Sequence, residues 1–354
     1  MGIASEFELD LLMNDIDDLE GKVNMNDIIL SKPGMADLPI RLGSFHADLS
    51  EKGKRKYHFN SDIVSAQLDG AFVPSKLIGD LQQFTKEISL YFKQNQLERL
   101  AYYAESKPNA FQKYNADFTL TLHEPQPILN RWFPTMQMSK NTVLFGVVNS
   151  ARAFNVSLEA YPDTLVFGAY KFYQTIFSSQ SSKFLGSPEL SSSLLFQSRK
   201  QKLNFLSPTE LLKVDALWDQ NRINFNVDLK QQGEENSAHL TGAWDFENEG
   251  FGLKFKDSYF RILGQDWAID PRNQLSLMGR DWKAENLYLS NQDQSIAMNG
   301  RLSKDSSAIL SLQANNFQLS TLGPLFKVKS ANSLETVISF LVRVPVLSVH
   351  MTLS

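Results

Sequence analysis

Residues 223–229 read INFNVDL, and this stretch decides the fold. Apolar side chains occupy every second position, and asparagine or aspartate fills the positions between them. Successive side chains of a β-strand point to opposite faces of the sheet, whereas an α-helix repeats about every 3.6 residues. The strict alternation therefore predicts a strand with one apolar face and one polar face.

The same alternation recurs at 118–122, 154–158, 238–244 and 296–302. Polar segments such as 231–236 and 303–307 separate these runs. Strand, polar turn and strand at short spacing indicate an antiparallel meander. The composition agrees, because the 25 phenylalanines among 354 residues suit the pleated faces of strands.

A weak repeat of the form apolar-x-Gly-x-apolar runs through the chain, at 19–23, 68–72, 144–148, 240–244 and 298–302. Glycine inside a strand tends to mark a bulge or a bend. Its recurrence from strand to strand predicts a sheet that curls, with chance recurrence of a common residue as the alternative.

Two segments depart from the period of two. Residues 74–92 carry apolar side chains at spacings of three and four, with proline at the start, which predicts an amphipathic helix. A shorter helix is expected at 126–132, ended by Pro134. We interpret both helices as caps on an open end of the sheet. A membrane-surface role is the alternative for the first helix, although its polar face is not rich in lysine.

Composition excludes several classes of protein. The formal net charge of -4 implies no basic face for nucleic acid, and the lack of cysteine rules out disulfides and thiolate chemistry. The start shows no signal-peptide pattern. The longest apolar stretch, 337–347, is too short for a membrane span and is interrupted by Arg343 and Pro345.

No motif for catalysis or for cofactor binding stands out. The five histidines are scattered singly, and no phosphate loop, dinucleotide fingerprint or nucleophile elbow occurs. Carboxylates gather at 15–20 and 245–249, in stretches that we interpret as solvated turns. The basic run at 52–56 reads as a hairpin tip, with contact to anionic head groups as the alternative. We therefore expect no enzyme, no catalytic residue, no metal and no cofactor.

Residues 266–322 carry a diffuse but familiar pattern, DWAIDPRNQLSLMGRDWKAENLYLSNQDQSIAMNGRLSKDSSAILSLQANNFQLSTL. Its elements are Trp267 with Ile269, then Asn273, then Leu287 with Leu289, followed by 294–300 and an ending at 316–319. Upstream, the strand at 68–70, the helix ending at 89–92 and the run 118–122 leading to 132–134 fit the same pattern. Over residues 19 to 326 the chain resembles the TamB family, the translocation and assembly module subunit of Gram-negative envelopes, and related AsmA-like proteins.

This resemblance implies a long sheet folded lengthwise into a groove, polar outside and apolar inside. It also implies a protein of the periplasm, anchored in the inner membrane by a segment that this chain lacks, with phospholipid or other acyl cargo and no nucleic acid. The implied partner is an outer-membrane barrel of the BamA or TamA type. The implied role is lipid transport, or assistance to outer-membrane protein assembly and secretion.

The expected fold is thus an all-β, elongated, curled antiparallel sheet that forms a groove, with one or two short inserted helices. We divide the chain into a β-meander at 1–73, a helix insert at 74–94, a groove segment at 95–326 and an atypical tail at 327–354 that does not resemble the family. The candidate groove-lining residues are Phe118, Leu120, Leu122, Phe154, Val156, Leu158, Ile223, Phe225, Val227, Leu229, Leu240 and Trp244.

Sequence alone leaves groove and closed sandwich open. A β-sandwich scaffold or adhesin-like module, binding through exposed loops, is the main alternative. An outer-membrane barrel uses the same alternation, but the helix at 74–92 and the irregular strands disfavour it.

Overall fold

A computed structural model describes residues 2–12, 15–31, 34, 37–50, 53–92, 96–105, 112–203, 207–247, 250–279, 281–303, 308–318 and 337–345. The chain divides into two units, unit 1 at 1–87 with 106–199 and unit 2 at 88–105 with 200–354. The predicted division into meander, helix, groove and tail stays a prediction, and 327–336 with 346–354 of the tail lie outside the described residues.

The all-β prediction is confirmed, since antiparallel strands dominate both units and only a few helices are inserted. The elements assigned mainly to unit 1 are β1 (Gly2–Leu12), a 3-10 turn (Ile16–Asp18), β2 (Glu20–Ser31), β3 (Leu38–Leu49), β4 (Arg55–Ser61), β5 (Val64–Ala71), α1 (Pro74–Phe92), β6 (Tyr114–Leu122), α3 (Pro125–Trp132), β7 (Met136–Met138), β8 (Thr142–Ser150), β9 (Phe154–Ala160), β10 (Thr164–Phe167), β11 (Tyr170–Lys183) and β12 (Leu190–Leu203).

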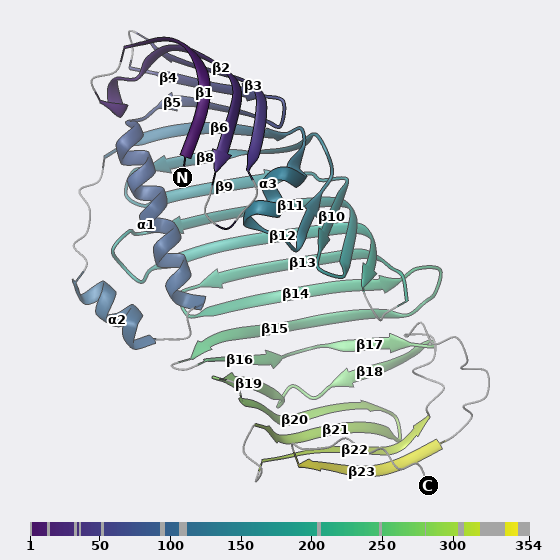
Figure 1. Ribbon diagram of the computed structural model, residues 1–354. Helices are drawn as coiled ribbons and strands as arrows, with labels where there is room; N and C mark the ends of the chain where they lie inside the picture. Colours follow the sequence, from purple (N-terminus) through teal and green to yellow (C-terminus); the bar gives the residue numbers. More distant parts are fainter. Residues whose placement is uncertain are drawn as a thin grey trace. The chain divides into compact units, whose positions relative to one another are not determined.

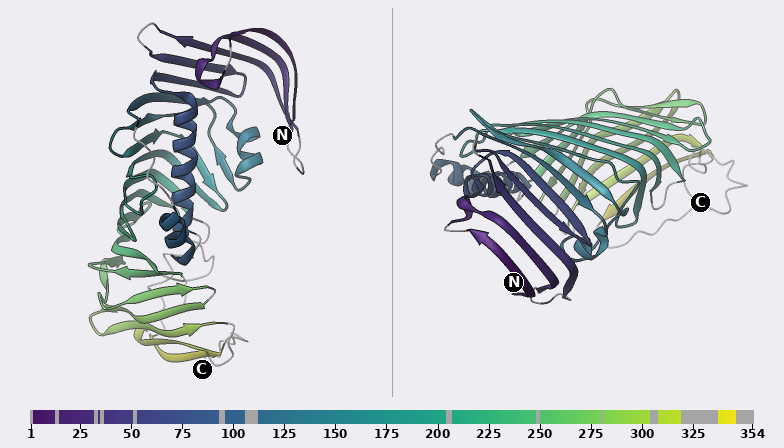
Figure 2. Two further views of the ribbon diagram at one scale, coloured as in Figure 1. Left: turned by 90° about the vertical axis from the view of Figure 1, so that its left-hand side faces the viewer. Right: turned by 90° about the horizontal axis from the view of Figure 1, so that it is seen from above.

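Unit 1 is built on a curled meander. Each strand from β1 to β6 pairs with the next, then β6 pairs with β8, β8 with β9 and β9 with β11, all antiparallel. The strands β1–β3 run in a different direction from β6, β8 and β9 (Figures 1 and 2). Gly70 in β5 has a φ of 151°, a backbone conformation that residues with a side chain rarely adopt.

Unit 2 continues the antiparallel pattern with one division of the sheet. Its elements are α2 (Gln96–Glu105), β13 (Thr209–Asp219), β14 (Arg222–Gln231), β15 (Ser237–Glu247), β16 (Gly250–Phe255), β17 (Tyr259–Ile262), β18 (Gln265–Ile269), β19 (Gln274–Met278), β20 (Asp281–Asn291), β21 (Gln294–Leu302), β22 (Ile309–Gln318) and β23 (Val337–Pro345). Strand β15 pairs with both β16 and β17, and the two branches meet again at β20 (Figure 1).

Two side chains complete the ladder where the sheet of unit 2 divides. The buried Asn273 accepts from the Phe255 N–H at 2.9 Å and donates to the Phe255 carbonyl at 3.0 Å. Ser258 makes the equivalent pair of bonds with Thr241, at 2.9 and 2.8 Å. Backbone groups that would otherwise be unpaired are satisfied in this way.

Two of the three helices were predicted from the sequence, and the third was not. Helix α1 covers 74–92 as expected, and α3 covers the expected 126–132 with one more residue, Pro125. Helix α2 was not predicted. Among the described residues, no helix is long and apolar enough to cross a membrane.

Candidate functional site

The strand register gathers apolar side chains onto one face of unit 2. Residues directly opposite in an antiparallel pair project from the same face of the sheet. Phe225 stands opposite Ala216 on one neighbour and Gly242 on the other. The other rows that cross β13, β14 and β15 are Trp218–Ile223–Trp244 and Val214–Val227–Leu240, and Leu229 faces Ala238. Four successive rows therefore form one continuous apolar face.

Unit 1 repeats this arrangement on β6, β8 and β9. Phe118 stands opposite Gly146, which stands opposite Leu158. The parallel rows are Ala116–Val148–Val156, Leu120–Leu144–Ala160 and Tyr114–Ser150–Phe154, and Leu122 faces Thr142. The same face extends to β5 and β4 through Leu68 and Tyr57.

All twelve candidate lining residues thus lie on the apolar face of their own unit. Leu122 and Phe154 are buried, and the other ten are half-buried. A face sealed by a second sheet would bury most of these side chains as fully as Phe154, which is 2% exposed. This partial exposure is compatible with a groove, although the polar residues between them on β14 are half-buried as well.

Glycine provides the room for a large aromatic side chain in both units. A Cβ atom at Gly242 would lie 2.6 Å from the Phe225 ring and closer still to the Lys254 carbonyl oxygen. A Cβ at Gly146 would lie 2.9 Å from the Phe118 ring and closer still to the Ser157 carbonyl oxygen. Each phenylalanine ring therefore lies over a bare stretch of backbone on the next strand. Side chains at these two positions would displace the rings from the face.

Two helices pack against the apolar face of unit 1 at separate places. Leu77, Leu81 and Phe84 of α1 join a core with Tyr114, Val148 and Phe154, and the Phe84 and Phe154 ring centroids lie 5.4 Å apart. Figure 2 shows α1 running across the strands. Ile128 of α3 packs with Leu38, Ile40 and Ile63 instead. Both helices therefore cover part of the apolar face. Their interpretation as caps on an open end of the sheet stays a prediction.

Polar groups hold α1 on the sheet. Lys183 of β11 and Glu87 of α1 form an ion pair at 2.9 Å, and both side chains are fully buried. Glu87 also accepts from the Gly186 N–H at 2.8 Å, and Lys183 donates to the Ser187 carbonyl at 2.6 Å. Burial lowers the pKa of Lys183, with the hydrogen bond to Glu87 acting in the opposite direction.

A second polar anchor lies two helical turns earlier. The buried carboxylate of Asp80 accepts from Tyr114 Oη at 2.9 Å and from Lys76 Nζ at 2.7 Å. Burial, followed by the hydrogen bond to Asp80, raises the pKa of Tyr114, so its hydroxyl stays a donor. Helix α1 is thus fixed at two points along its length.

In unit 2, aromatic rings at the end of α1 cover one edge of the apolar face. Tyr91 and Phe92 both contact Trp218 and Phe246, with ring centroids 5.1 to 5.8 Å apart. Arg99 of α2 stacks over Tyr91, with its guanidinium carbon 4.4 Å from the ring centroid. The outer side of α2 carries Leu97 and Leu100, which are 79% and 54% exposed.

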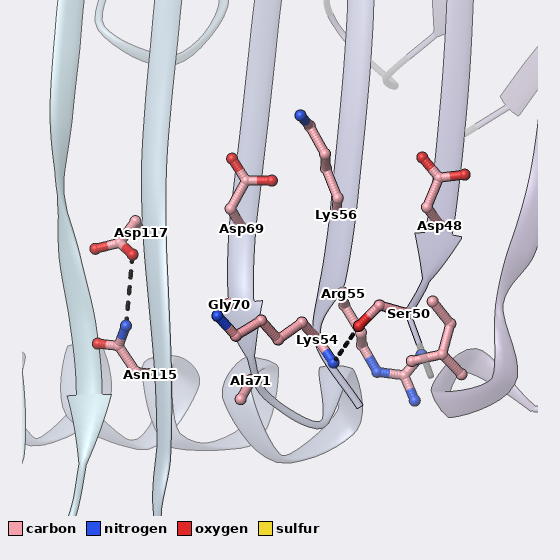
Figure 3. Close-up of a pocket in the computed structure, with 11 residues that line it drawn as sticks. Asp48, Ser50, Lys54, Arg55, Lys56, Asp69, Gly70, Ala71, Asn115 and Asp117 are labelled. Carbon is pink, nitrogen blue, oxygen red and sulfur yellow. Dashed lines mark hydrogen bonds between the residues drawn. The ribbon is translucent and has the colours of Figure 1, made fainter. Parts of the chain in front are cut away.

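Gly53 and Lys54 of the basic run lie in the turn of the β3–β4 hairpin, as predicted, Arg55 and Lys56 begin β4, and Lys52 lies outside the described residues. The Ser50 N–H donates to the Lys54 carbonyl at 2.8 Å and closes the turn between β3 and β4. The cavity beside it, of about 690 Å³, is shown in Figure 3. Three cations (Lys54, Arg55, Lys56) and three carboxylates (Asp48, Asp69, Asp117) line it, so it carries no net positive charge. This balance disfavours an anion site.

The chain matches no protein-family model, no curated protein and no solved structure. Its function must therefore be inferred from its own residues.

One arrangement on the polar face resembles a catalytic triad and was not predicted. His239 lies 2.7 Å from Asp228 and 3.3 Å from the Thr241 hydroxyl. The Thr241 N–H donates to Ser258, however, so it cannot serve an oxyanion, and the hydroxyl also contacts Asn226 at 3.2 Å. We interpret the group as a polar ladder between strands.

No group of three or more potential metal ligands occurs among the described residues. Asp245 and Glu247 lie in β15, so the prediction of a turn at these two residues was wrong, and Glu249 lies outside the described residues. Asp245 accepts two hydrogen bonds from Arg222, at 2.6 and 3.1 Å. The absence of an enzyme activity stays a prediction.

Proposed function

We propose that this chain is a segment of an envelope conduit of TamB type, which carries phospholipid acyl chains along an apolar groove. The single observation that supports this is the half-buried apolar face of each unit, made of aligned rows such as Ala216–Phe225–Gly242. In the proposed setting the chain lies in the periplasm and works with an outer-membrane barrel during outer-membrane assembly.

Elementary energetics favours acyl chains as the cargo. Each Å² of apolar surface that leaves water contributes about 25 cal/mol, and each buried methylene contributes about 0.8 kcal/mol. An apolar face can hold an acyl chain without any specific polar contact, which is consistent with a site that has no cluster of functional groups.

The test is lipid copurification with matched charge variants. The intact chain is purified and its bound lipids are extracted and identified by mass spectrometry. We expect wild type to carry phospholipid. Phe225→Asp places a carboxylate on the apolar face and should abolish the bound lipid, because a charge in an apolar site is strongly disfavoured.

Asn226→Asp is the matched control, since it adds the same charge to the next residue, on the opposite face of β14. It should retain lipid at the wild-type level. Wild type without lipid, or equal lipid in both variants, would refute the conduit. The first of these results would favour a β-rich scaffold that guides barrel assembly without carrying cargo.

A further inference from the structure

A small pocket lies at one end of the apolar face of unit 2. It has a volume of about 140 Å³, and its apolar wall is formed by Leu229, Ala238, Phe260 and Ile262. Leu229 faces Ala238, and Ala238 faces Phe260, so these side chains continue the rows of the apolar face. The volume is below the roughly 300 Å³ at which pockets for whole drug-sized ligands begin. It therefore suits one end of a longer molecule.

Thr209 adds an unused polar group to this pocket. Its side chain is 6% exposed, and among the residues that the structure describes its Oγ1 has no hydrogen-bond partner. Thr209 stands opposite Gln231, on the same face as Leu229. Buried polar atoms without a partner are rare in folded proteins, and each one calls for an explanation. A ligand oxygen in the pocket would supply the missing partner.

The other polar residues that line the pocket are uncharged, and Asn236 and Gln231 among them already form hydrogen bonds. The Asn236 side chain accepts from the Leu263 N–H at 2.7 Å and donates to Gln231 Oε1 at 2.9 Å. No Lys, Arg, Asp or Glu is among the described residues that line the pocket. Because a charge without a partner is disfavoured in such a site, the pocket selects against a phosphate or an ammonium group.

We propose that this pocket holds the uncharged glycerol end of a monoacylglycerol, with its acyl chain along the apolar face of unit 2. The proposal rests on the proposed lipid-carrying function and names a ligand class for one place in it. The Thr209 hydroxyl bonds the glycerol hydroxyl or the ester carbonyl, and Leu229 and Phe260 contact the first methylenes.

The test measures binding of 1-monooleoylglycerol and of dioleoylphosphatidylethanolamine to the delipidated intact chain by native mass spectrometry. Thr209→Val removes the hydroxyl and keeps the shape. It should weaken monooleoylglycerol binding about fivefold, the ratio that corresponds to one hydrogen bond of ~1 kcal/mol. Thr209→Ser, which keeps a hydroxyl, should bind like wild type. Thr241→Val, which removes a hydroxyl from the polar face, is the matched control and should also bind like wild type.

Thermal unfolding of the free protein provides a second readout. Thr209→Val should raise Tm, because it removes a buried hydroxyl without a partner, and it should nevertheless bind the ligand less tightly. A purely structural role for the hydroxyl predicts a lower Tm instead and would overturn the proposal.

Two other outcomes separate this proposal from the conduit. Wild type that binds the phospholipid but not monooleoylglycerol would overturn the pocket assignment and leave the conduit intact, as would equal monooleoylglycerol affinity in wild type and Thr209→Val. Failure to bind either lipid would overturn both.

Discussion

Removal of the buried Lys183 charge should release α1 from the sheet of unit 1. In Lys183→Met the Glu87 carboxylate would stay in a site with no exposed side-chain surface and would lose its cationic partner, although Gly186 N–H and Gln83 Nε2 would still donate to it, each at 2.8 Å. Breaking a buried ion pair on one side costs about 3–5 kcal/mol, because the other charge is left uncompensated. We expect the free energy of local opening at α1 to fall by this amount.

The double variant Glu87→Gln with Lys183→Met separates the ion pair from packing. It removes both charges, and glutamine can still accept from the Gly186 N–H. Its cost should be about 1–2 kcal/mol, mainly the lost bond from Lys183 to the Ser187 carbonyl, which spans 2.6 Å. The double variant should therefore be more stable than the single one, which is the sign expected for a buried pair.

Hydrogen exchange followed by mass spectrometry gives the local free energies from peptides that cover 74–92 and 170–187. Lys171→Met is the control, because Lys171 lies on the same strand, β11, and is exposed. It should change neither peptide. If Lys183→Met behaved like Lys171→Met, or if the double variant were as unstable as the single one, the pair would not be buried as described.

Three further changes have defined outcomes. Gly242→Ala should destabilise unit 2 by about 1–3 kcal/mol in urea unfolding, because its Cβ would overlap the Lys254 carbonyl oxygen and the Phe225 ring; an unchanged midpoint would contradict the close approach. Asn273→Ala should lose about 2–3 kcal/mol and speed amide exchange at Phe255, whose N–H and C=O lose their partner; slow exchange there would contradict the bridging role. The hydrogen bond from Arg272 holds the pKa of Asp270 at about 2 against 3.8 when unfolded, so its stabilising contribution is present above pH 3.8 and is lost as pH falls toward 2. Asp270→Asn should flatten the stability profile in that window, and an unaltered profile would count against this pair.

The spacing of apolar residues was sufficient to predict those strands and helices that depend only on residues close together in the sequence. The alternation at 223–229 lies in β14, and the three- and four-residue spacing at 74–92 became α1. In α1 one side of the helix packs on the sheet and the other faces solvent, whereas in β14 the alternation separates an apolar face from a polar face that are both half-buried. Helix α2 was missed because its side chains do not follow this rule. Leu97 and Leu100 face outward, and the inward contact is made by Arg99 on Tyr91.

Contacts between residues far apart in the sequence could not be predicted, because no periodic pattern marks them. Glu87 and Gly186 are 99 positions apart, and Asn273 and Phe255 are 18 apart. A lysine in a polar strand and an asparagine in a turn look like solvated residues, and only the fold reveals that both are fully buried. The division of the sheet at β15 was missed for the same reason, because two partners for one strand leave its alternation unchanged.

The two units reach the same local arrangement with different residues, and this bears on how a lipid could be carried. Phe118 over Gly146 and Phe225 over Gly242 both place a ring on the bare backbone of the next strand. Under the proposed function, a face built by repeating such rows would gain its affinity for acyl chains from apolar area, which is additive, and not from a unique group. Apolar exchanges within the face should therefore be tolerated, whereas a charge or a filled glycine should interrupt it. That asymmetry is the expected signature of a carrier surface, and an enzyme site would instead fail on the loss of one polar side chain.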